Sequence, residues 1–554
     1  MSELDSRLQI IPLGGLGEIG KNMAAIRYGD TILVIDAGLM FPEDELLGID
    51  IVLPDISYLI ENREKVKGIL LTHGHEDHVG GLPYVLKEMN VPVYGSRLTI
   101  GIAANKLREH EIDYAALYEV KPRDCVDFGE MRAEFIRVCH SIPDCMGIAI
   151  HTPLGIVLHT GDFKLDQTPV DGQTVDFRKL AEIAEKGVLA MLSDSTNAER
   201  PGFTMSEKVV GNTFDDLFGK CKGRIIITTF ASNVHRIQQV IRTAEKYNRK
   251  VAVAGRSMVN NVQVSSELGY IDIPPGIMVD IEDINHFPPE KMVIVTTGSQ
   301  GEPMSALTRM ATADHRWVSI QPGDTVIISA TPIPGNEKLV ARTVDLLYRQ
   351  GAEVIYEKRM GVHVSGHASQ EELKILLNLI KPKYFVPVHG EYRHLMTHAK
   401  LAEDLGITRS SIFVMENGQI LELDEREAQV TGKVASGKIL VDGLGVGDVG
   451  NIVLRDRRQL AQDGIIIVVV TIDKEIVEIA AGPDLVSRGF VYVRESEQLM
   501  EEAREKVREA LEVCMKKGLT EWAMIKAQVR EKLSRFLYEK TGRKPMILPI
   551  IMEI

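Results

Sequence analysis

The segment "LTHGHEDHVGG", residues 71–81, gathers three histidines and an aspartate within six positions, although the whole 554-residue chain has only 15 histidines. On a loop between a strand and a helix, these side chains cannot all reach one atom, but alternate positions can serve two metal ions. His73 and His75 then face one ion, and Asp77 and His78 face the other. Imidazole nitrogens and carboxylate oxygens are suitable ligands for zinc or manganese. The spacing therefore predicts half of a two-metal centre.

Three further polar residues stand where apolar strands are expected to end. His140 follows "FIRVC", Asp162 follows "IVLHTG", and His389 follows "YFVPV". Taken singly, each is equally well explained as a satisfied residue of a turn or loop edge. Because α/β folds collect active sites at the C-terminal ends of strands, we expect all three to join the first cluster. Seven ligands with one bridging carboxylate would leave a positive centre suited to an anionic substrate such as a phosphodiester.

Composition and charge narrow the class of protein. A hydrophobic content of 44% and a charged content of 26% are typical of a soluble globular protein, and the length suggests three domains. The net charge of −14 argues against nonspecific coating of nucleic acid, but not against a nucleic-acid enzyme with a confined positive channel. Five scattered cysteines without a CxxC pair indicate neither a disulfide framework nor a thiolate zinc site. With no signal-peptide pattern and no apolar run long enough to span a bilayer, we expect a cytoplasmic protein without membrane contact.

The patterning predicts an order of domains along the chain. Short apolar strands separated by turns fill residues 1–195 and return over 361–430, whereas 196–360 alternates strands and helices like a doubly wound parallel unit. Residues 431–455 are rich in glycine and are expected to form a linker. Residues 456–554 should form a small α+β domain with two charged helices and a closing strand.

Two other segments carry polar residues suited to a nucleic-acid substrate. "HVSGH" precedes an expected helix, and its side chains and backbone N–H groups suit a phosphate cradle, a satisfied turn being the alternative. Its residues are His363, Val364, Ser365, Gly366 and His367. "TFASNVHR" offers Ser232, Asn233, His235 and Arg236 as contacts to an RNA backbone, with helix capping as the alternative.

The metal motif followed by His140, Asp162 and His389 resembles the metallo-β-lactamase superfamily, and the long insertion before His389 resembles its β-CASP branch. Within that branch the chain is similar, nearly end to end, to the ribonuclease J family. The similarity includes "LGGLGEIGKN", "FPEDELLGID", "HTGDFK", "SDSTN", "TGSQGEP", "HGEYRH" and "PMILPIIMEI". This resemblance implies an α/β fold: an αββα sandwich, an inserted β-CASP α/β domain and a small C-terminal α+β domain.

The resemblance also implies residue roles. His73, His75 and His140 would hold one zinc ion, Asp77, His78 and His389 the other, and Asp162 would bridge them, with manganese or magnesium as alternative metals. Asp194 matches the first β-CASP motif and is a further candidate RNA contact. In the expected mechanism Asp77 orients the nucleophile, and either His363 or His367 protonates the departing oxygen.

The activity implied is a 5′→3′ exonuclease that favours RNA with a 5′-monophosphate and also cuts internally, in rRNA maturation and mRNA decay. Its expected partners are RNA, a second copy of the chain in a dimer or tetramer, and other RNA-decay proteins. Some members of this family lose part of the first metal motif, whereas this chain keeps every ligand, which favours an active enzyme. The competing hypotheses are a non-catalytic RNA-decay scaffold, a small-molecule hydrolase of the metallo-β-lactamase type, and a DNA nuclease.

Overall fold

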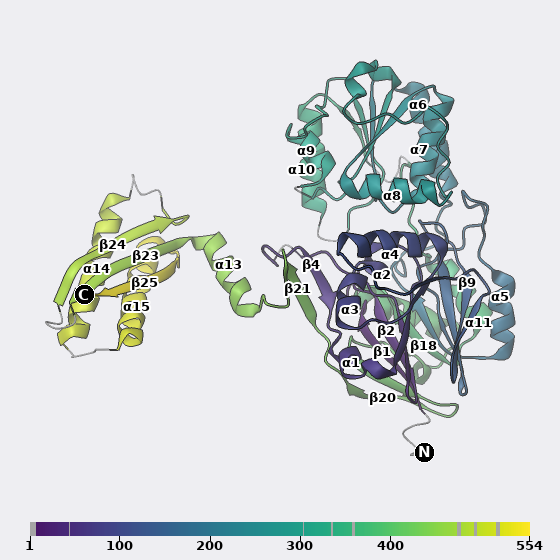
Figure 1. Ribbon diagram of the computed structural model, residues 1–554, viewed down its shortest axis with the longest axis horizontal. Coiled ribbons are helices and arrows are strands. Elements are labelled where there is room, and N and C mark those ends of the chain that lie inside the picture. Colours follow the sequence, from purple (N-terminus) through teal and green to yellow (C-terminus); the bar gives the residue numbers. More distant parts are fainter. Residues whose placement is uncertain are drawn as a thin grey trace. The chain divides into compact units, whose positions relative to one another are not determined.

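The computed structural model describes residues 7–43, 45–302, 304–333, 336–356, 361–473, 478–491, 496–516 and 521–554. The chain forms two compact units (Figure 1). The first contains Met1–Phe41 and Ile51–Ile439, and the second contains Pro42–Asp50 and Leu440–Ile554. Among the described residues, no helix combines the length and apolar character needed to cross a bilayer.

Two mixed sheets form the centre of the first unit. One has the strand order β20-β19-β1-β2-β3-β5-β6-β7 and the other β18-β12-β11-β10-β9-β8. Their strands are β1 (Leu8–Gly14), β2 (Met23–Tyr28), β3 (Thr31–Ile35), β5 (Val66–Leu70), β6 (Val93–Gly95), β7 (Leu117–Glu119), β8 (Cys125–Phe128), β9 (Met131–Arg137), β10 (Met146–Thr152), β11 (Gly155–His159), β12 (Val188–Asp194), β18 (Tyr384–Val388), β19 (Gln419–Leu423) and β20 (Ala428–Lys433). Ile26 and Leu33 of the first sheet share one buried cluster with Phe135, Ile148 and Val386 of the second, so the two sheets pack face to face.

Helices cover the outer faces of this sandwich (Figure 1). They are α1 (Ser57–Glu61), α2 (Glu76–Val79), α3 (Leu82–Glu88), α4 (Arg97–Glu109), α5 (Phe177–Lys186), α11 (Gln370–Ile380) and α12 (Tyr392–Asp404), and the short strand β4 (Ile51–Pro54) precedes α1. Alternate residues of each strand point outward, so Val34 and Ile69 share a second buried cluster with Leu82 of α3, and Met191 shares it with Leu376 of α11. The predicted αββα sandwich is confirmed.

A parallel α/β domain is inserted between β12 and β18, which are neighbours in the second sheet. Its sheet has the order β14-β15-β13-β16-β17, and every pair is parallel. The elements are α6 (Lys208–Lys220), β13 (Ile225–Thr228), α7 (Val234–Lys246), β14 (Lys250–Ala254), α8 (Arg256–Glu267), β15 (Met292–Thr296), α9 (Ala306–Ala311), β16 (Thr325–Ile328), α10 (Glu337–Arg349) and β17 (Glu353–Ile355). Ile227 packs with α6 and α7, whereas Ile226 packs with α9 and α10, so helices cover both faces as predicted.

The second unit contains a three-stranded sheet of order β24-β23-β25. Its elements are α13 (Asn451–Asp463), β23 (Ile465–Asp473), β24 (Glu478–Arg488), α14 (Glu497–Lys516), α15 (Trp522–Thr541) and β25 (Met546–Glu553). Helices α14 and α15 pack on one face of the sheet, in agreement with the predicted α+β domain. Residues 431–455, which were expected to form a linker, contain regular structure: β21 (Lys438–Asp442), β22 (Gly445–Val446) and the start of α13. The apolar residues of "KILVD" form a strand despite the surrounding glycines.

Candidate metal centre

The seven predicted ligands lie on four segments, each of which follows the C-terminal end of a strand; Asp77 and His78 are in the short helix α2. His73, His75, Asp77 and His78 follow β5, His140 follows β9, Asp162 follows β11, and His389 follows β18. Strands β11, β12 and β18 are parallel neighbours, so the loops that leave them lie side by side. The fold therefore brings together side chains that are up to several hundred residues apart in the sequence.

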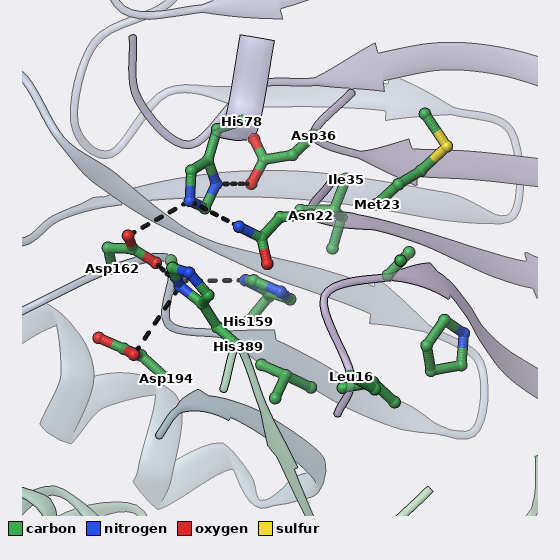
Figure 2. A pocket seen from close by; sticks show the side chains of 15 residues that line it. Leu16, Asn22, Met23, Ile35, Asp36, His78, His159, Asp162, Asp194 and His389 are labelled. Atoms are coloured by element: carbon green, nitrogen blue, oxygen red, sulfur yellow. Dashed lines mark hydrogen bonds and ion pairs between the residues drawn. The ribbon is translucent and has the colours of Figure 1, made fainter. Parts of the chain in front are cut away.

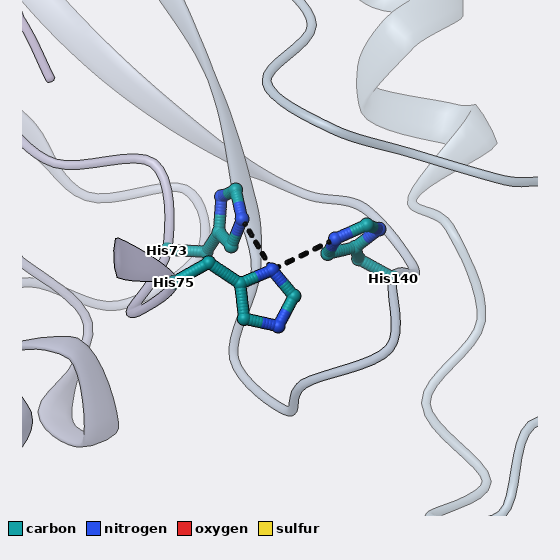
Figure 3. A group of neighbouring side chains, drawn as sticks. All are labelled: His73, His75 and His140. Atoms are coloured by element: carbon teal, nitrogen blue, oxygen red, sulfur yellow. Dashed lines mark hydrogen bonds between the residues drawn. The ribbon is translucent and has the colours of Figure 1, made fainter. Parts of the chain in front are cut away.

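Three imidazoles form the first cluster (Figure 3). The Nδ1 atom of His75 lies 3.0 Å from Nε2 of His73 and 3.1 Å from Nε2 of His140. One ring nitrogen has a single proton or a single lone pair, so it cannot make a good hydrogen bond to both neighbours. A tetrahedral zinc ion with Zn–N bonds of about 2.0–2.1 Å would hold its nitrogens about 3.3 Å apart. The three nitrogens therefore fit a shared cation.

The second cluster contains two carboxylates and two imidazoles: Asp77, His78, Asp162 and His389. Figure 2 shows the last three of these side chains. The Nε2 atom of His78 lies 3.2 Å from Oδ2 of Asp162, and Nε2 of His389 lies 3.4 Å from Oδ2 of Asp77. This His389 nitrogen is buried and makes no hydrogen bond among the described residues. A buried ring nitrogen that faces a carboxylate without a hydrogen bond to it is expected where a cation belongs.

Asp162 lies between the two clusters. Its Oδ2 atom is 3.7 Å from Nε2 of His73 and 3.7 Å from Nε2 of His140, while Oδ1 is 2.7 Å from Nδ1 of His389. Burial raises the pKa of Asp162, but the charges of His389 and His78 outweigh it and hold the pKa well below its ordinary value. An ionised carboxylate with contacts on both sides suits a bridging ligand.

Acceptors outside the clusters fix the tautomers of two ligands. Asp36, at a left-handed φ of 61°, accepts hydrogen bonds from the backbone N–H and hydroxyl of Thr72 at 2.7 and 2.8 Å. It also lies 2.7 Å from Nδ1 of His78, and a carboxylate can only accept, so Nε2 of His78 presents its lone pair to the centre. The carbonyl of Gly366 acts in the same way on Nδ1 of His140, at 2.8 Å.

The imidazoles of the two clusters differ in their charge states. Burial lowers the pKa of His75 to about 4 and holds those of His73 and His140 well below the ordinary value, so the first cluster is neutral, the form that binds metal. At His389 burial also acts to lower the pKa, but Asp162 and Asp77 raise it to about 10. The carboxylates thus favour positive charge at this point, and a bound cation would replace the proton.

The "HVSGH" loop, residues 363–367, lies directly beside the first cluster. Its first, third and fifth side chains are half-buried, and its second and fourth positions are buried. Asn197 Nδ2 donates to Ser365 Oγ at 2.8 Å and to the carbonyl two residues further on at 2.9 Å. A Cβ atom on Gly366 would lie 2.5 Å from Cε1 of His140, so only glycine fits against this ligand.

His367 of this loop faces a buried carboxylate. Its Nδ1 atom lies 2.8 Å from Oδ2 of Asp194 and 3.8 Å from Oδ2 of Asp162. Burial acts to lower the pKa of His367, but these two carboxylates outweigh it and raise the pKa above its ordinary value. The buried Asp194 carboxylate therefore accepts a hydrogen bond from His367, and this leaves it poorly placed for the RNA contact expected from the sequence.

The segment of residues 232–236 is largely turned into the protein. Asn233 accepts a hydrogen bond from the backbone N–H of Arg236 and caps α7, and His235 is buried near Asp171. Arg236 is 0% exposed and donates to both oxygens of Glu207. This burial contradicts direct RNA contacts by Asn233 and Arg236 and agrees with helix capping, the alternative interpretation. Ser232 is only half-buried.

Four models of known protein families match separate parts of this chain, in the same order as the domains of the fold. The family models that match are "Metallo-beta-lactamase superfamily" over residues 16–186, "Ribonuclease J, beta-CASP domain" over 222–347, "Zn-dependent metallo-hydrolase RNA specificity domain" over 351–413 and "Ribonuclease J C-terminal domain" over 452–554. A solved structure from Enterococcus faecalis V583, described as a protein of unknown function, shares the fold with a TM-score of 0.54 at 18% identity, over 76% of this chain and 100% of that one.

Two curated relatives match almost from end to end. Ribonuclease J2 of Bacillus subtilis (strain 168) is 50% identical over 548 residues, covering 99% of each chain. Ribonuclease J 2 of Staphylococcus saprophyticus is 46% identical over 551 residues, again covering 99% of each chain. With a sandwich fold, an inserted parallel domain and a His/Asp centre already in place, these matches show that the chain belongs to the ribonuclease J family of the metallo-β-lactamase superfamily.

Proposed function

We propose that this chain is a two-metal ribonuclease that degrades RNA from the 5′ end, prefers a 5′-monophosphate and also cuts internally. The observation that carries the proposal is the convergence of seven ligands beside the "HVSGH" loop, with Asp162 between the two clusters. This complete ligand set argues against a non-catalytic scaffold. The inserted parallel domain and the loop next to the metals argue against a small-molecule hydrolase, which needs neither.

The metals proposed are two zinc ions, with manganese or magnesium as alternatives. His73, His75 and His140 would hold one ion, Asp77, His78 and His389 the other, and Asp162 both. Two divalent ions held there would supply a water activated at neutral pH and positive charge beside the attacked phosphate. Three neutral nitrogens on one side and two carboxylates on the other give a donor set suited to zinc.

The side chains around the metals supply orientation and protons. Asp77 lies at the open side of the second cluster, with a side chain 30% exposed, and would orient the attacking water. His367 has its Nδ1 proton fixed by Asp194 and a raised pKa, so its Nε2 can deliver a proton to the departing 3′-oxygen. These contacts favour His367 over His363 as the general acid.

The loop 363–367 would bind the 5′-monophosphate. Its half-buried polar side chains are His363, Ser365 and His367. The Gly366 carbonyl contacts His140, so a phosphate held by this loop lies within about one nucleotide of the metals. A pocket at that separation makes the enzyme measure from the 5′ end and release mononucleotides, which is the basis of the proposed direction.

The experiment uses one RNA sequence carrying a 5′-monophosphate, a 5′-triphosphate or a 5′-hydroxyl, incubated with zinc- or manganese-loaded protein. We expect mononucleotides to appear fastest from the monophosphate. Asp77→Ala should abolish the release, and a same-sequence DNA should be cut poorly. Cleavage that ignores the 5′ group would refute the phosphate cradle, and no cleavage of any RNA would favour the scaffold.

We further propose that the chain forms a homodimer, or a tetramer built from it, through its C-terminal domain. The sheet face that α14 and α15 leave uncovered is apolar, with Leu548, Ile550 and Met552 exposed on β25. An apolar sheet face of this kind is expected to be covered by a partner, and a second copy is the simplest one. The proposed setting is the cytoplasm, with other RNA-decay proteins, in rRNA maturation and mRNA decay.

The proposed domains are a metallo-β-lactamase domain in two parts, residues 1–195 and 361–430, around a β-CASP domain, residues 196–360. The C-terminal domain is placed at 456–554. The order of the matched families supports this division.

A further inference from the structure

Asn22, the residue before β2, places its side-chain amide against two predicted ligands of the second ion. Its Nδ2 atom lies 3.1 Å from Nε2 of His78 and 3.4 Å from Oδ2 of Asp77. Figure 2 shows that the same ring nitrogen of His78 faces both this amide and the carboxylate of Asp162. Asn22 is only 8% exposed, so its amide belongs to the interior of the centre and not to the surface around it.

The Nε2 atom of His78 has more close neighbours than one lone pair can serve. Asp36 holds a proton of this ring on Nδ1, so Nε2 offers a single lone pair. It lies 3.1 Å from the amide nitrogen of Asn22, 3.2 Å from Oδ2 of Asp162 and 3.6 Å from Oδ2 of Asp77. Ligand atoms held about 2.0–2.1 Å from one tetrahedral ion are about 3.3 Å apart. The amide of Asn22 therefore lies at the distance expected for a ligand of the same ion as His78.

A cation in this cluster would reverse the preferred orientation of the amide. An NH₂ group is a donor only, and its partly positive hydrogens would face the ion, whereas an amide carbonyl oxygen is an ordinary ligand of divalent ions. The last side-chain torsion of asparagine is broad and roughly two-fold, so half a turn about it exchanges the two atoms. The oxygen then takes the place of the nitrogen without any displacement of the backbone.

The surroundings of Asn22 hold its backbone in place and leave room for the amide. Its backbone N–H donates to the carbonyl of Asp77 at 3.0 Å, and its own carbonyl accepts from the N–H of Gly38 at 3.0 Å. A Cβ atom on Gly15 would lie 2.3 Å from Oδ1 of Asn22, so only glycine leaves space for this side chain. Asn22 also lines a cavity of about 20 Å³, which has room for one water molecule to accept from the turned NH₂ group.

We propose that the side-chain oxygen of Asn22 is a fifth ligand of the second ion, in addition to the two carboxylates and two imidazoles of that cluster. This inference rests on the proposed function, because it requires two ions at the centre. The second site then has three oxygen and two nitrogen ligands, whereas the first has three imidazoles and the shared carboxylate. Carboxylate and carbonyl oxygens suit manganese, and imidazole suits zinc. Asn22 thus raises the preference of the second site for manganese over zinc.

The most direct test is a crystal structure of the wild-type protein loaded with manganese, in which anomalous scattering locates each ion. We expect an amide atom of Asn22 at about 2.0–2.5 Å from the second ion, the range of bonds between divalent ions and oxygen. Nitrogen and oxygen of an amide look alike at ordinary resolution, so this distance decides the question. An amide that stays beyond this range, as an NH₂ group that donates to Asp77 would, overturns the inference.

Manganese binding followed by EPR tests the role of the oxygen without any measurement of activity, because free manganese in water gives a signal that the bound ion does not. Asn22→Leu removes the oxygen at similar volume and should weaken binding of the second manganese ion by about tenfold or more. Zinc at that site should lose less, since zinc is commonly four-coordinate. Asn22→Asp keeps an oxygen in the same place and should bind manganese at least as tightly as the wild type. Unchanged binding in Asn22→Leu, or weaker binding in Asn22→Asp, would refute the inference.

Asn233 provides a matched control. It is also buried, and its side chain accepts a hydrogen bond from the backbone N–H of Arg236 at 3.2 Å. Asn233→Leu should leave both manganese affinities unchanged, and a loss equal to that of Asn22→Leu would show a general structural effect and overturn the inference. If the wild type binds a single ion, the two-metal centre fails first and the inference fails with it. If the wild type binds two ions and Asn22→Leu binds both equally well, the inference alone fails.

Discussion

The carboxylate of Glu372 offers a sharp test of how the fold holds the site, because it joins three loops through backbone hydrogen bonds. Glu372 is 0% exposed. Its Oε1 accepts from the N–H of Leu165 at 2.8 Å, and its Oε2 accepts from the N–H groups of Thr204 at 2.7 Å and Ser369 at 2.8 Å. Leu165 is three residues beyond Asp162, so this one carboxylate connects the bridging ligand to the loop that would hold the phosphate.

The perturbation is Glu372→Gln, which keeps the shape but replaces one oxygen by an NH₂ group. The amide oxygen can keep the two bonds at the Oε2 position, which leaves the NH₂ group opposite the N–H of Leu165. A hydrogen bond to a charged group contributes about 1.5–3 kcal/mol, so opening of the Leu165 amide should become easier by about this amount. Since about 1.4 kcal/mol is a factor of ten, its hydrogen exchange should be roughly 10- to 150-fold faster.

Hydrogen exchange read by mass spectrometry on the peptide that contains Leu165 measures this effect without assuming that a chain of several domains unfolds in one step. Glu371→Gln is the matched control, because the Glu371 side chain is 44% exposed and, among the described residues, its carboxylate pairs with Lys374 alone. We expect slower turnover in Glu372→Gln as well, through displacement of Asp162. Unchanged exchange at Leu165 in Glu372→Gln, relative to both wild type and Glu371→Gln, would refute the reasoning.

Three further predictions follow from side chains outside this network. His398 is fully buried, and burial lowers its pKa to about 3. Between about pH 6.5 and pH 3 the unfolded chain binds a proton at this histidine and the folded chain does not. The free energy of unfolding should therefore fall by about 1.4 kcal/mol for each unit by which the pH is lowered through this range. His398→Asn should flatten the acid dependence of denaturant midpoints between pH 4 and 6, and an unchanged slope would contradict this. Asp194→Asn removes a carboxylate that raises the pKa of His367. Because the general acid must carry a proton, the alkaline limb of the pH–rate profile should move to lower pH. If the position of this limb does not change, His367 is not the acid. Leu548→Glu on the uncovered sheet face should give monomers in sedimentation experiments, whereas an intact dimer would place the interface elsewhere.

The fold was largely predictable because its strands are continuous apolar runs that end at glycine or polar residues. In the inserted domain "RIIITT" and "KMVIVTT" are buried on both faces, which is the pattern of a parallel sheet, and both form parallel strands. Residues 431–455 were predicted less well. Their glycines suggested a linker, but pairing between β21 and β22 outweighs the local preference for a loop.

The candidate site could be predicted where residue types and local spacing carry the information, as in the HxHxDH loop. Its supporting contacts could not, because they join positions that are distant in sequence. Asp36 reaches His78 across 42 positions, and Glu372 reaches Leu165 across 207. For the segment that contains Arg236, the sequence did not decide between RNA contact and helix capping. The guanidinium of Arg236 faces the interior because it pairs with Glu207, and the sequence does not show that these two residues are neighbours.

The central claim is that seven side chains hold two metal ions that act together on RNA. Its most direct test is a titration of metal-free protein with zinc or manganese, in which bound metal per chain and cleavage of 5′-monophosphate RNA are measured on the same samples. The account predicts that binding saturates at two ions and that cleavage appears only as the second site fills. Full cleavage with one ion per chain, or cleavage that persists in excess chelator, would contradict it.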